Sequence, residues 1–219
     1  PSRDVADTGK VISGDLPRPF GKYTLVRELG RGAMGIVCEA HDPGLNRKVA
    51  LKLMIPGAHE SAEAAALEEA YFVREAQMAA RLEKHPHIVT VYEAGAVDGR
   101  RYIAMEFLSA VPLSDWILER RPSLRTQVKL LRDVARAVHH AHEGGVLHRD
   151  LKPENVLIDA QGRPYVTDFG MAKHFSSDPG KSSTSAGMVG GTPSYMSPEQ
   201  AQGRKKIDRR TDVYSLGAM

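Results

Sequence analysis

The chain has 219 residues, of which 42% are hydrophobic and 26% charged, and its formal net charge is +3. This is the composition of an ordinary folded domain and argues against intrinsic disorder. Its single cysteine, Cys38, excludes an intrachain disulfide framework, and no apolar run reaches the roughly 18 residues of a membrane span. No long basic run is present, so nucleic acid is not an expected partner.

The two ends of the sequence suggest a piece of a longer protein. The chain begins with Pro1, carries no signal-peptide pattern and stops at Met219 inside an apolar segment. We expect a cytoplasmic location for this piece, while the parent protein could be tethered to a membrane outside it. Residues 1–19 mix proline, glycine, serine and charged residues without periodicity and are expected to form a flexible tail or linker.

A glycine-rich stretch joins the first two predicted strands. The strand-like runs 23–29 and 36–40 flank residues 30–35, GRGAMG. In such a hairpin, backbone N–H groups can approach phosphate oxygens because glycine has no side chain to intrude. A β-branched run follows the loop where a dinucleotide-binding fold would need a helix. The pattern therefore argues against a Rossmann fold.

A lysine lies among apolar residues in the next predicted strand, 48–54. The strand alternates, so that Ala50 and Lys52 share one face, although Lys52 could also be an exposed edge residue. In the helix predicted to follow, over 61–84, Glu75 lies on the apolar stripe and needs a cation. Lys52 is the candidate for that cation. Solvated alternatives to Glu75 are Glu68 and Glu69.

The middle of the chain changes from strands to helices. Strands are predicted at 88–93 and 101–106, and helices at 113–119 and 124–142, with Gly144 and Gly145 ending the second helix. This helix carries an apolar stripe that we expect to be buried. Its members are Leu124, Val128, Leu131, Val134, Ala135 and Val138.

The stretch 146–157, VLHRDLKPENVL, reads as a catalytic loop. It places a carboxylate, two cations and a carboxamide between apolar anchors. Thirteen residues after Asn155, Asp168 opens the sequence Asp-Phe-Gly behind a strand-like run at 163–167. Asn155 and Asp168 carry hard oxygen ligands, which suit magnesium.

Together with the glycine loop, Lys52 and Glu75, these motifs resemble the Hanks-type (eukaryotic-like) serine/threonine protein kinases, in particular bacterial members. The resemblance implies an α+β, protein-kinase-like bilobal fold. A strand-rich N-lobe with one helix would occupy 20–108, and a mainly helical C-lobe would occupy 109–219, truncated at the start of its central helix. The implied cofactors are ATP and Mg²⁺, and the implied partners are proteins with Ser/Thr hydroxyls.

The resemblance also assigns roles at the site. Asp150 would accept or orient the substrate hydroxyl proton, Lys152 would meet the γ-phosphate, and Lys52, paired with Glu75, would hold the α- and β-phosphates. Asn155 and Asp168 would hold magnesium. His148 and Phe169 would link the catalytic loop to the helix, and Asp212 would support the catalytic-loop backbone. The implied ATP contacts are Leu29, Gly30, Gly32, Gly35, Val37, Ala50, Lys52, Met105, Glu106, Leu108 and Leu157.

Substrate class and regulation can be read from the segment after Asp168. Lys152 and residues 191–199, GTPSYMSPE, resemble the serine/threonine branch of the family, with Ser197 where alanine is usual. Residues 176–187 are small and polar and need an added constraint to become ordered. We expect a phosphate to supply it by binding Arg149, which would switch activity; a merely solvated loop is the alternative. Candidate phosphosites are Thr184 first, then Ser183 and Ser185.

Two other function classes stay open. A pseudokinase or scaffold would bind nucleotide without turnover, but Lys52, Asp150, Asn155 and Asp168 are all present. A small-molecule phosphotransferase of related fold would not need the long Ser/Thr-rich segment. Self-association for autophosphorylation is a further expected interaction of the parent protein.

Overall fold

The computed structural model describes residues 15–32, 35–55, 76–80, 82–169, 193–204 and 206–219. Contacts divide the chain into two compact units, residues 1–69 with 91–107 and residues 70–90 with 108–219. The domain ranges expected from the sequence, with boundaries after residues 19 and 108, stay a prediction.

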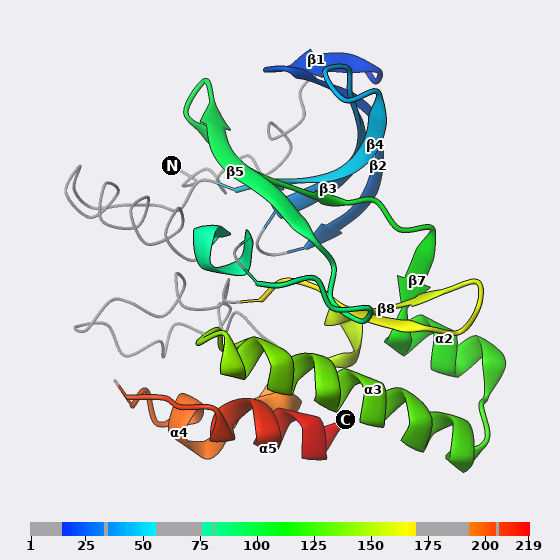
Figure 1. The fold of residues 1–219 in the computed structure, drawn as a ribbon, viewed down its shortest axis with the longest axis vertical. Coiled ribbons are helices and arrows are strands. Elements are labelled where there is room, and N and C mark those ends of the chain that lie inside the picture. Colours follow the sequence, from blue (N-terminus) through cyan, green and yellow to red (C-terminus); the bar gives the residue numbers. More distant parts are fainter. Residues whose placement is uncertain (1–14, 33–34, 56–75, 81, 170–192, 205) are drawn as a thin grey trace, which may run out of the picture. The chain divides into compact units, whose positions relative to one another are not determined.

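The first unit is built on a six-stranded antiparallel sheet of order β1-β2-β3-β4-β6-β5 (Figure 1). β1 reaches back into the range expected as a tail, because Arg18 and Phe20 pair with Leu25 and Tyr23. The strands are β1 (Arg18–Phe20), β2 (Tyr23–Gly32), β3 (Gly35–Asp42), β4 (Arg47–Met54), β5 (Val91–Val97) and β6 (Arg100–Glu106).

The strand predicted at 88–93 was placed too early. β5 begins at Val91, whereas the residues before it bond to another strand: Val89 N donates to Val166 O, and Val166 N donates to His87 O, both at 2.9 Å. Ile88 forms an isolated parallel bridge with Val166. Residues 87–89 therefore bond within the second unit, to which they belong, and the first sheet takes up the chain only from Val91.

One face of the first sheet forms a hydrophobic core. Alternation along β4 sends Val49, Leu51 and Leu53 to this face, and all three are fully buried. Tyr102 packs edge-on against Phe20 and Tyr23, with ring centroids 5.7 and 5.8 Å apart. The cluster consists of Phe20, Tyr23, Leu25, Ile36, Cys38, Ala40, Val49, Leu51, Leu53, Tyr102 and Ala104. Cys38 is thus a core residue.

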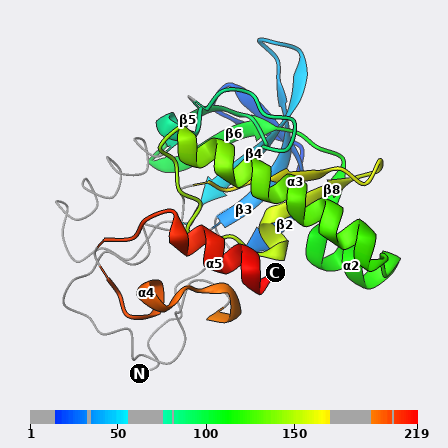
Figure 2. The same cartoon turned by 60° about the horizontal axis from the view of Figure 1, so that its bottom comes forward.

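The second unit combines helices with a three-stranded sheet of order β7-β8-β9 (Figures 1 and 2). Ser123 caps the long helix at its start by accepting from Thr126 N, and Gly144 follows its end. Of the helix predicted over 61–84, the structure describes a helical stretch at 76–80. The bounds are β7 (Ala110–Pro112), α2 (Leu113–Arg120), α3 (Leu124–Glu143), β8 (Val156–Asp159), β9 (Pro164–Val166), α4 (Pro198–Ala201) and α5 (Arg210–Ala218).

The buried stripe of α3 differs from the predicted one. Leu124 is 75% exposed and Val128 57%. α3 carries two apolar stripes, and the one facing β9 and the catalytic loop is the one that the described residues cover. Val134 and Val138 were predicted correctly. The buried residues are Leu130, Val134, Ala137, Val138 and Ala141.

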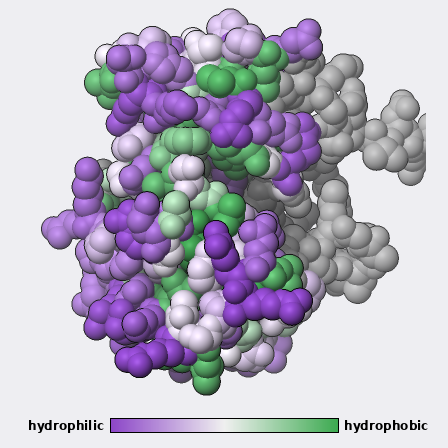
Figure 3. All heavy atoms as spheres, turned by 90° about the vertical axis from the view of Figure 1, so that its right-hand side faces the viewer, coloured by the Kyte–Doolittle hydropathy of each residue, from purple (hydrophilic) through white to green (hydrophobic). Residues whose placement is uncertain are grey.

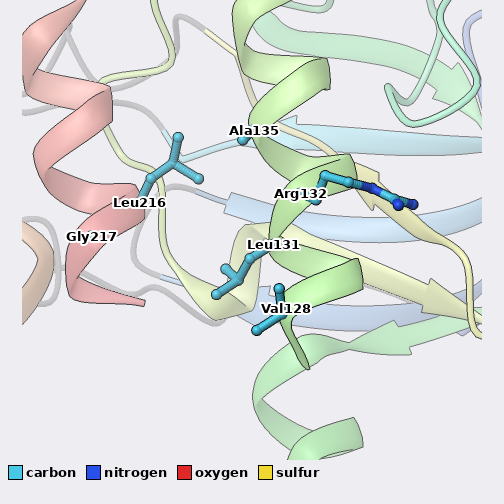
Figure 4. Close-up of a pocket in the computed structure, with 6 residues that line it drawn as sticks. All are labelled: Val128, Leu131, Arg132, Ala135, Leu216 and Gly217. Atoms are coloured by element: carbon cyan, nitrogen blue, oxygen red, sulfur yellow. The ribbon is translucent and has the colours of Figure 1, made fainter. Parts of the chain in front are cut away.

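The second stripe of α3 borders α5, which runs beside it (Figures 1 and 2). Val128, Leu131 and Ala135 line an open apolar pocket together with Leu216 and Gly217 of α5. Arg132, on the rim, points away from the pocket (Figure 4).

The visible surface in Figure 3 is largely hydrophilic, with separate hydrophobic patches between polar side chains. Large apolar side chains that are exposed include Leu45 at 66% and Leu118 at 76%. Within the described ranges, no helix combines the length and apolar character needed to cross a membrane.

Candidate active site

Asp212, at the start of α5, holds the backbone of the catalytic loop. Its buried carboxylate accepts hydrogen bonds from His148 N at 2.9 Å and Arg149 N at 2.7 Å. His142 Nε2 lies 2.7 Å from the same carboxylate. Burial alone would raise the pKa of Asp212, but the hydrogen bond from His142 and those from the backbone outweigh it and lower that pKa. The expected support of the catalytic loop by Asp212 is confirmed.

These bonds stabilise an unusual backbone conformation. Arg149 has φ of 67°, in the left-handed region that residues with a side chain rarely adopt. Such a conformation costs about 1–2 kcal/mol and persists where surrounding contacts enforce it. The strained residue immediately precedes Asp150, so the direction of the Asp150 side chain depends on these contacts.

The Asp150 carboxylate is oriented by two neighbours from its own loop. Lys152 Nζ lies 2.8 Å from Asp150 Oδ2, and Asn155 Nδ2 donates to the same oxygen at 3.1 Å and to the Asp150 carbonyl at 2.7 Å. The Asp150 side chain is 16% exposed. Its Oδ1 accepts no hydrogen bond from the described residues. The structure thus brings together three of the predicted site residues.

His148 connects the catalytic loop to the segment that carries Asp168. It is fully buried, its Nε2 lies 2.9 Å from Thr167 O, and Asp150 N donates to its Nδ1 at 3.3 Å. Burial lowers the pKa of His148, against the opposing effect of Asp212. One neutral tautomer, with the proton on Nε2, satisfies both hydrogen bonds. The ring also packs against Phe169, with centroids 4.9 Å apart.

The two predicted magnesium ligands lie on segments that are bonded to each other. Thr167 N, next to Asp168, donates to Asn155 O at 3.0 Å. The Asn155 amide nitrogen is bonded to Asp150, so its side-chain oxygen is the atom that can bind a cation. An amide oxygen and a carboxylate are hard ligands that fit Mg²⁺, whose remaining positions are commonly filled by phosphate and water. Asp168 is half-buried and has φ of 65°.

Four of the predicted nucleotide contacts in the first unit share one face of its sheet. Val37 pairs with Lys52, and Ala50 pairs with Met105, across antiparallel strands. Directly paired residues point to the same side, as do residues two apart in one strand. These four side chains therefore lie opposite the core face. Lys52, Ala50 and Met105 are buried, at 5%, 8% and 6% exposure.

The three loop glycines differ in what surrounds them. A Cβ at Gly35 would sit 2.2 Å from the carbonyl oxygen of Leu53, so this position excludes any side chain. A Cβ at Gly30 or Gly32 would meet nothing within 4 Å. Packing against β4 thus requires glycine at Gly35, while the space beside Gly30 and Gly32 is available for a ligand, and their contacts with ATP stay a prediction.

For the remaining predicted site residues, the structure gives the position and the exposure only. Leu29 is 38% exposed, and Glu106 ends β6. Leu108 and Leu157 are half-buried in the second unit. Glu75 and the candidate phosphosites Thr184, Ser183 and Ser185 lie outside the described residues, so the pair of Lys52 with Glu75 stays a prediction.

Two residues at the site were not assigned roles from the sequence. His142 bonds Asp212, and Gln200 Nε2 donates to Arg149 O at 2.6 Å. No local spacing links His142 to a residue 70 positions away. The sequence contains one signal for Gln200: Ser197 lies three residues earlier, and together they form the S-x-x-Q pattern of a capping box.

Comparisons with known proteins agree with this geometry. Residues 23–219 match the protein kinase domain family. The chain is 39% identical over 201 residues to the serine/threonine-protein kinase PknD of Mycobacterium tuberculosis, covering 91% of this chain and 29% of PknD. It is 36% identical over 201 residues to the serine/threonine-protein kinase PrkC of Bacillus subtilis, covering 91% of this chain and 30% of PrkC. The chain thus spans less than a third of the length of these curated relatives.

Solved structures show the same fold. The kinase domain of Mycobacterium tuberculosis PknI has a TM-score of 0.72 at 33% identity, covering 94% of this chain and 74% of that one. The apo form of PpkA-294 has a TM-score of 0.75 at 23% identity, covering 94% and 76%. The predicted α+β, protein-kinase-like fold is confirmed. The chain belongs to the protein kinase domain family, and its relatives include bacterial serine/threonine-protein kinases.

Proposed function

We propose that the protein containing this chain is an ATP-dependent serine/threonine protein kinase, which transfers the γ-phosphoryl group of ATP to hydroxyls of protein substrates. The observation that carries the proposal is the Asp150 carboxylate, which Lys152 and Asn155 orient through Oδ2, while its Oδ1 accepts no hydrogen bond from the part of the chain that the structure describes. The named relatives support the serine/threonine class.

Positioning and charge screening are the main demands of phosphoryl transfer. Asp150 Oδ1 would accept the hydrogen bond of the substrate hydroxyl and direct its oxygen toward the phosphorus. Lys152, held beside the same carboxylate, would offset the charge of the γ-phosphate. Lys52 would bind the α- and β-phosphates from the first unit. Magnesium held by Asn155 and Asp168 would neutralise phosphate charge during transfer.

Regulation by phosphorylation belongs to the same proposal. A phosphate on Thr184, or on Ser183 or Ser185, would bring nearly two negative charges and three acceptor oxygens to Arg149. The planar guanidinium fork suits such a group. Mass spectrometry of the full-length protein after incubation with ATP and Mg²⁺ would test this, together with the activity of Thr184→Ala alone and combined with alanine at the two serines.

The test of the kinase activity is Asp150→Asn in the full-length protein. Transfer of labelled γ-phosphate to a generic protein substrate should fall by at least about a hundredfold, because the oxygen that orients the hydroxyl loses its charge. ATP affinity should change by no more than a few-fold, since Asp150 is assigned no nucleotide contact. Asp133→Asn is the matched control, because Asp133 lies on α3 beside Arg132 and Arg136.

Three outcomes separate the functions. Loss of transfer in Asp150→Asn alone supports a kinase. A wild-type protein that binds ATP but transfers nothing would indicate the pseudokinase or scaffold. Unchanged turnover in Asp150→Asn would remove this carboxylate from the mechanism.

A further inference from the structure

The side-chain amide of Gln200, in α4, joins this helix to the catalytic loop. Its Nε2 donates to the carbonyl oxygen of Arg149 at 2.6 Å. Its Oε1 accepts from Ser197 N at 3.1 Å and from Thr211 Oγ1 at 2.9 Å. One half-buried side chain thus bridges α4, α5 and the residue before Asp150.

The hydrogen-bond chemistry fixes the orientation of this amide. The Ser197 backbone N–H can only donate, and the Arg149 carbonyl can only accept, so exchanging the oxygen and nitrogen of Gln200 would break both bonds. Ser197 and Thr211 are fully buried, and their hydroxyls bond each other, which shields the network from water. The amide is therefore held as a rigid connector.

The connector acts on the same strained residue that Asp212 holds. Asp212 accepts from Arg149 N, while Gln200 donates to Arg149 O. The two contacts restrain both peptide groups around a residue with φ of 67°. The second of these peptide groups also contains Asp150 N.

We propose that Gln200 is a positioning residue, which sets the direction of the Asp150 carboxylate by holding the Arg149–Asp150 peptide. Ser197 and Thr211 keep its amide oriented for this purpose. The inference rests on the proposed kinase function of Asp150 and adds that productive alignment of Asp150 requires α4 to be docked. Gln200 itself is assigned no contact with substrate or nucleotide.

The test is Gln200→Glu in the full-length protein. Glutamate keeps the volume and can still accept from Ser197 N, since S-x-x-E is also a capping box. It replaces the donor to Arg149 by a carboxylate oxygen facing a carbonyl oxygen. We expect kcat to fall about tenfold or more while the KM for ATP stays within about twofold.

The control is Gln202→Glu, which makes the same change of charge two residues away. Gln202 is exposed and accepts a hydrogen bond from Arg204, so the kinetics of this variant should match those of the wild type.

A second pair of variants tests the Thr211 hydroxyl, which orients the Gln200 amide. Thr211→Val removes the donor to Gln200 and should lower kcat, whereas Thr211→Ser keeps the hydroxyl and should retain most of it.

A structural readout separates this inference from the proposed function. Hydrogen–deuterium exchange should be faster over residues 147–151 in Gln200→Glu than in the wild type and in Gln202→Glu. A kcat within about twofold of the wild type, or unchanged exchange in this loop, would overturn the role of Gln200. Faster loop exchange with an inactive wild-type protein would instead uphold the connector and reject the proposed kinase function.

Discussion

Replacing Asp212 by asparagine tests how the catalytic loop is held. The carboxylate accepts from two backbone donors, His148 N and Arg149 N, and also bonds His142. Asparagine has the same shape but one acceptor oxygen, so one of these N–H groups must face the Nδ2 hydrogens. Losing a charge-assisted bond and leaving a buried donor unpaired should cost about 3 kcal/mol of stability.

Native-state hydrogen exchange in the full-length protein measures this cost. The buried amides of α3, over residues 134–141, exchange through opening of the second unit, and about 3 kcal/mol corresponds to roughly a hundredfold loss of protection. Asp208→Asn is the control, because Asp208 is an exposed aspartate near the same helix start. It should leave protection unchanged.

The stabilisation that the Asp212 carboxylate provides should decrease at low pH. The folded-state pKa of Asp212 is lowered below the unfolded value of about 3.9. Its stabilisation is therefore fully present above about pH 4 and is lost as the pH falls through the folded pKa. The deficit of Asp212→Asn should be the same at about pH 7.5 and pH 5.5. Protection equal to the wild type at both values would refute the structural role of Asp212.

Three further changes test other parts of the structure. Gly35→Ala should destabilise the first unit by about 1–3 kcal/mol, because the new Cβ would lie 2.2 Å from Leu53 O; exchange of β3 and β4 amides measures it, and Gly32→Ala should have little effect. His148→Gln should flatten the pH dependence of the free energy of unfolding. In the wild type, the lowered folded-state pKa of His148 makes the free energy of unfolding decrease as the pH drops below about 6.5, by up to about 1.4 kcal/mol per pH unit. Thermal unfolding that gives the variant and the wild type the same slope against pH would contradict this. Asp168→Ala should abolish the Mg²⁺-dependent part of ATP binding, and an equal loss without Mg²⁺ would argue against a metal ligand.

Local sequence patterns determined the elements and the main site motifs. Alternation in 48–54 placed Ala50 and Lys52 on one face, and the register of β3, β4 and β6 agrees. The helix predicted at 124–142 ends within one residue of α3, because Gly144 follows directly. The motif around Asp150 could be recognised by its resemblance to a family pattern, since its residues lie within six positions of one another and fold as one loop.

Tertiary structure decided which surfaces are covered and which distant groups meet. Both apolar stripes of α3 look alike in sequence, and only packing on β9 and the catalytic loop selects the buried one. Residues 87–89 have strand character, but their hydrogen bonds go to β9. Asp212 and Gln200 reach Arg149 from 63 and 51 positions away. A buried polar group bonds whatever donor or acceptor the packed chain brings within about 3 Å, and that proximity in space leaves no periodic trace in the sequence.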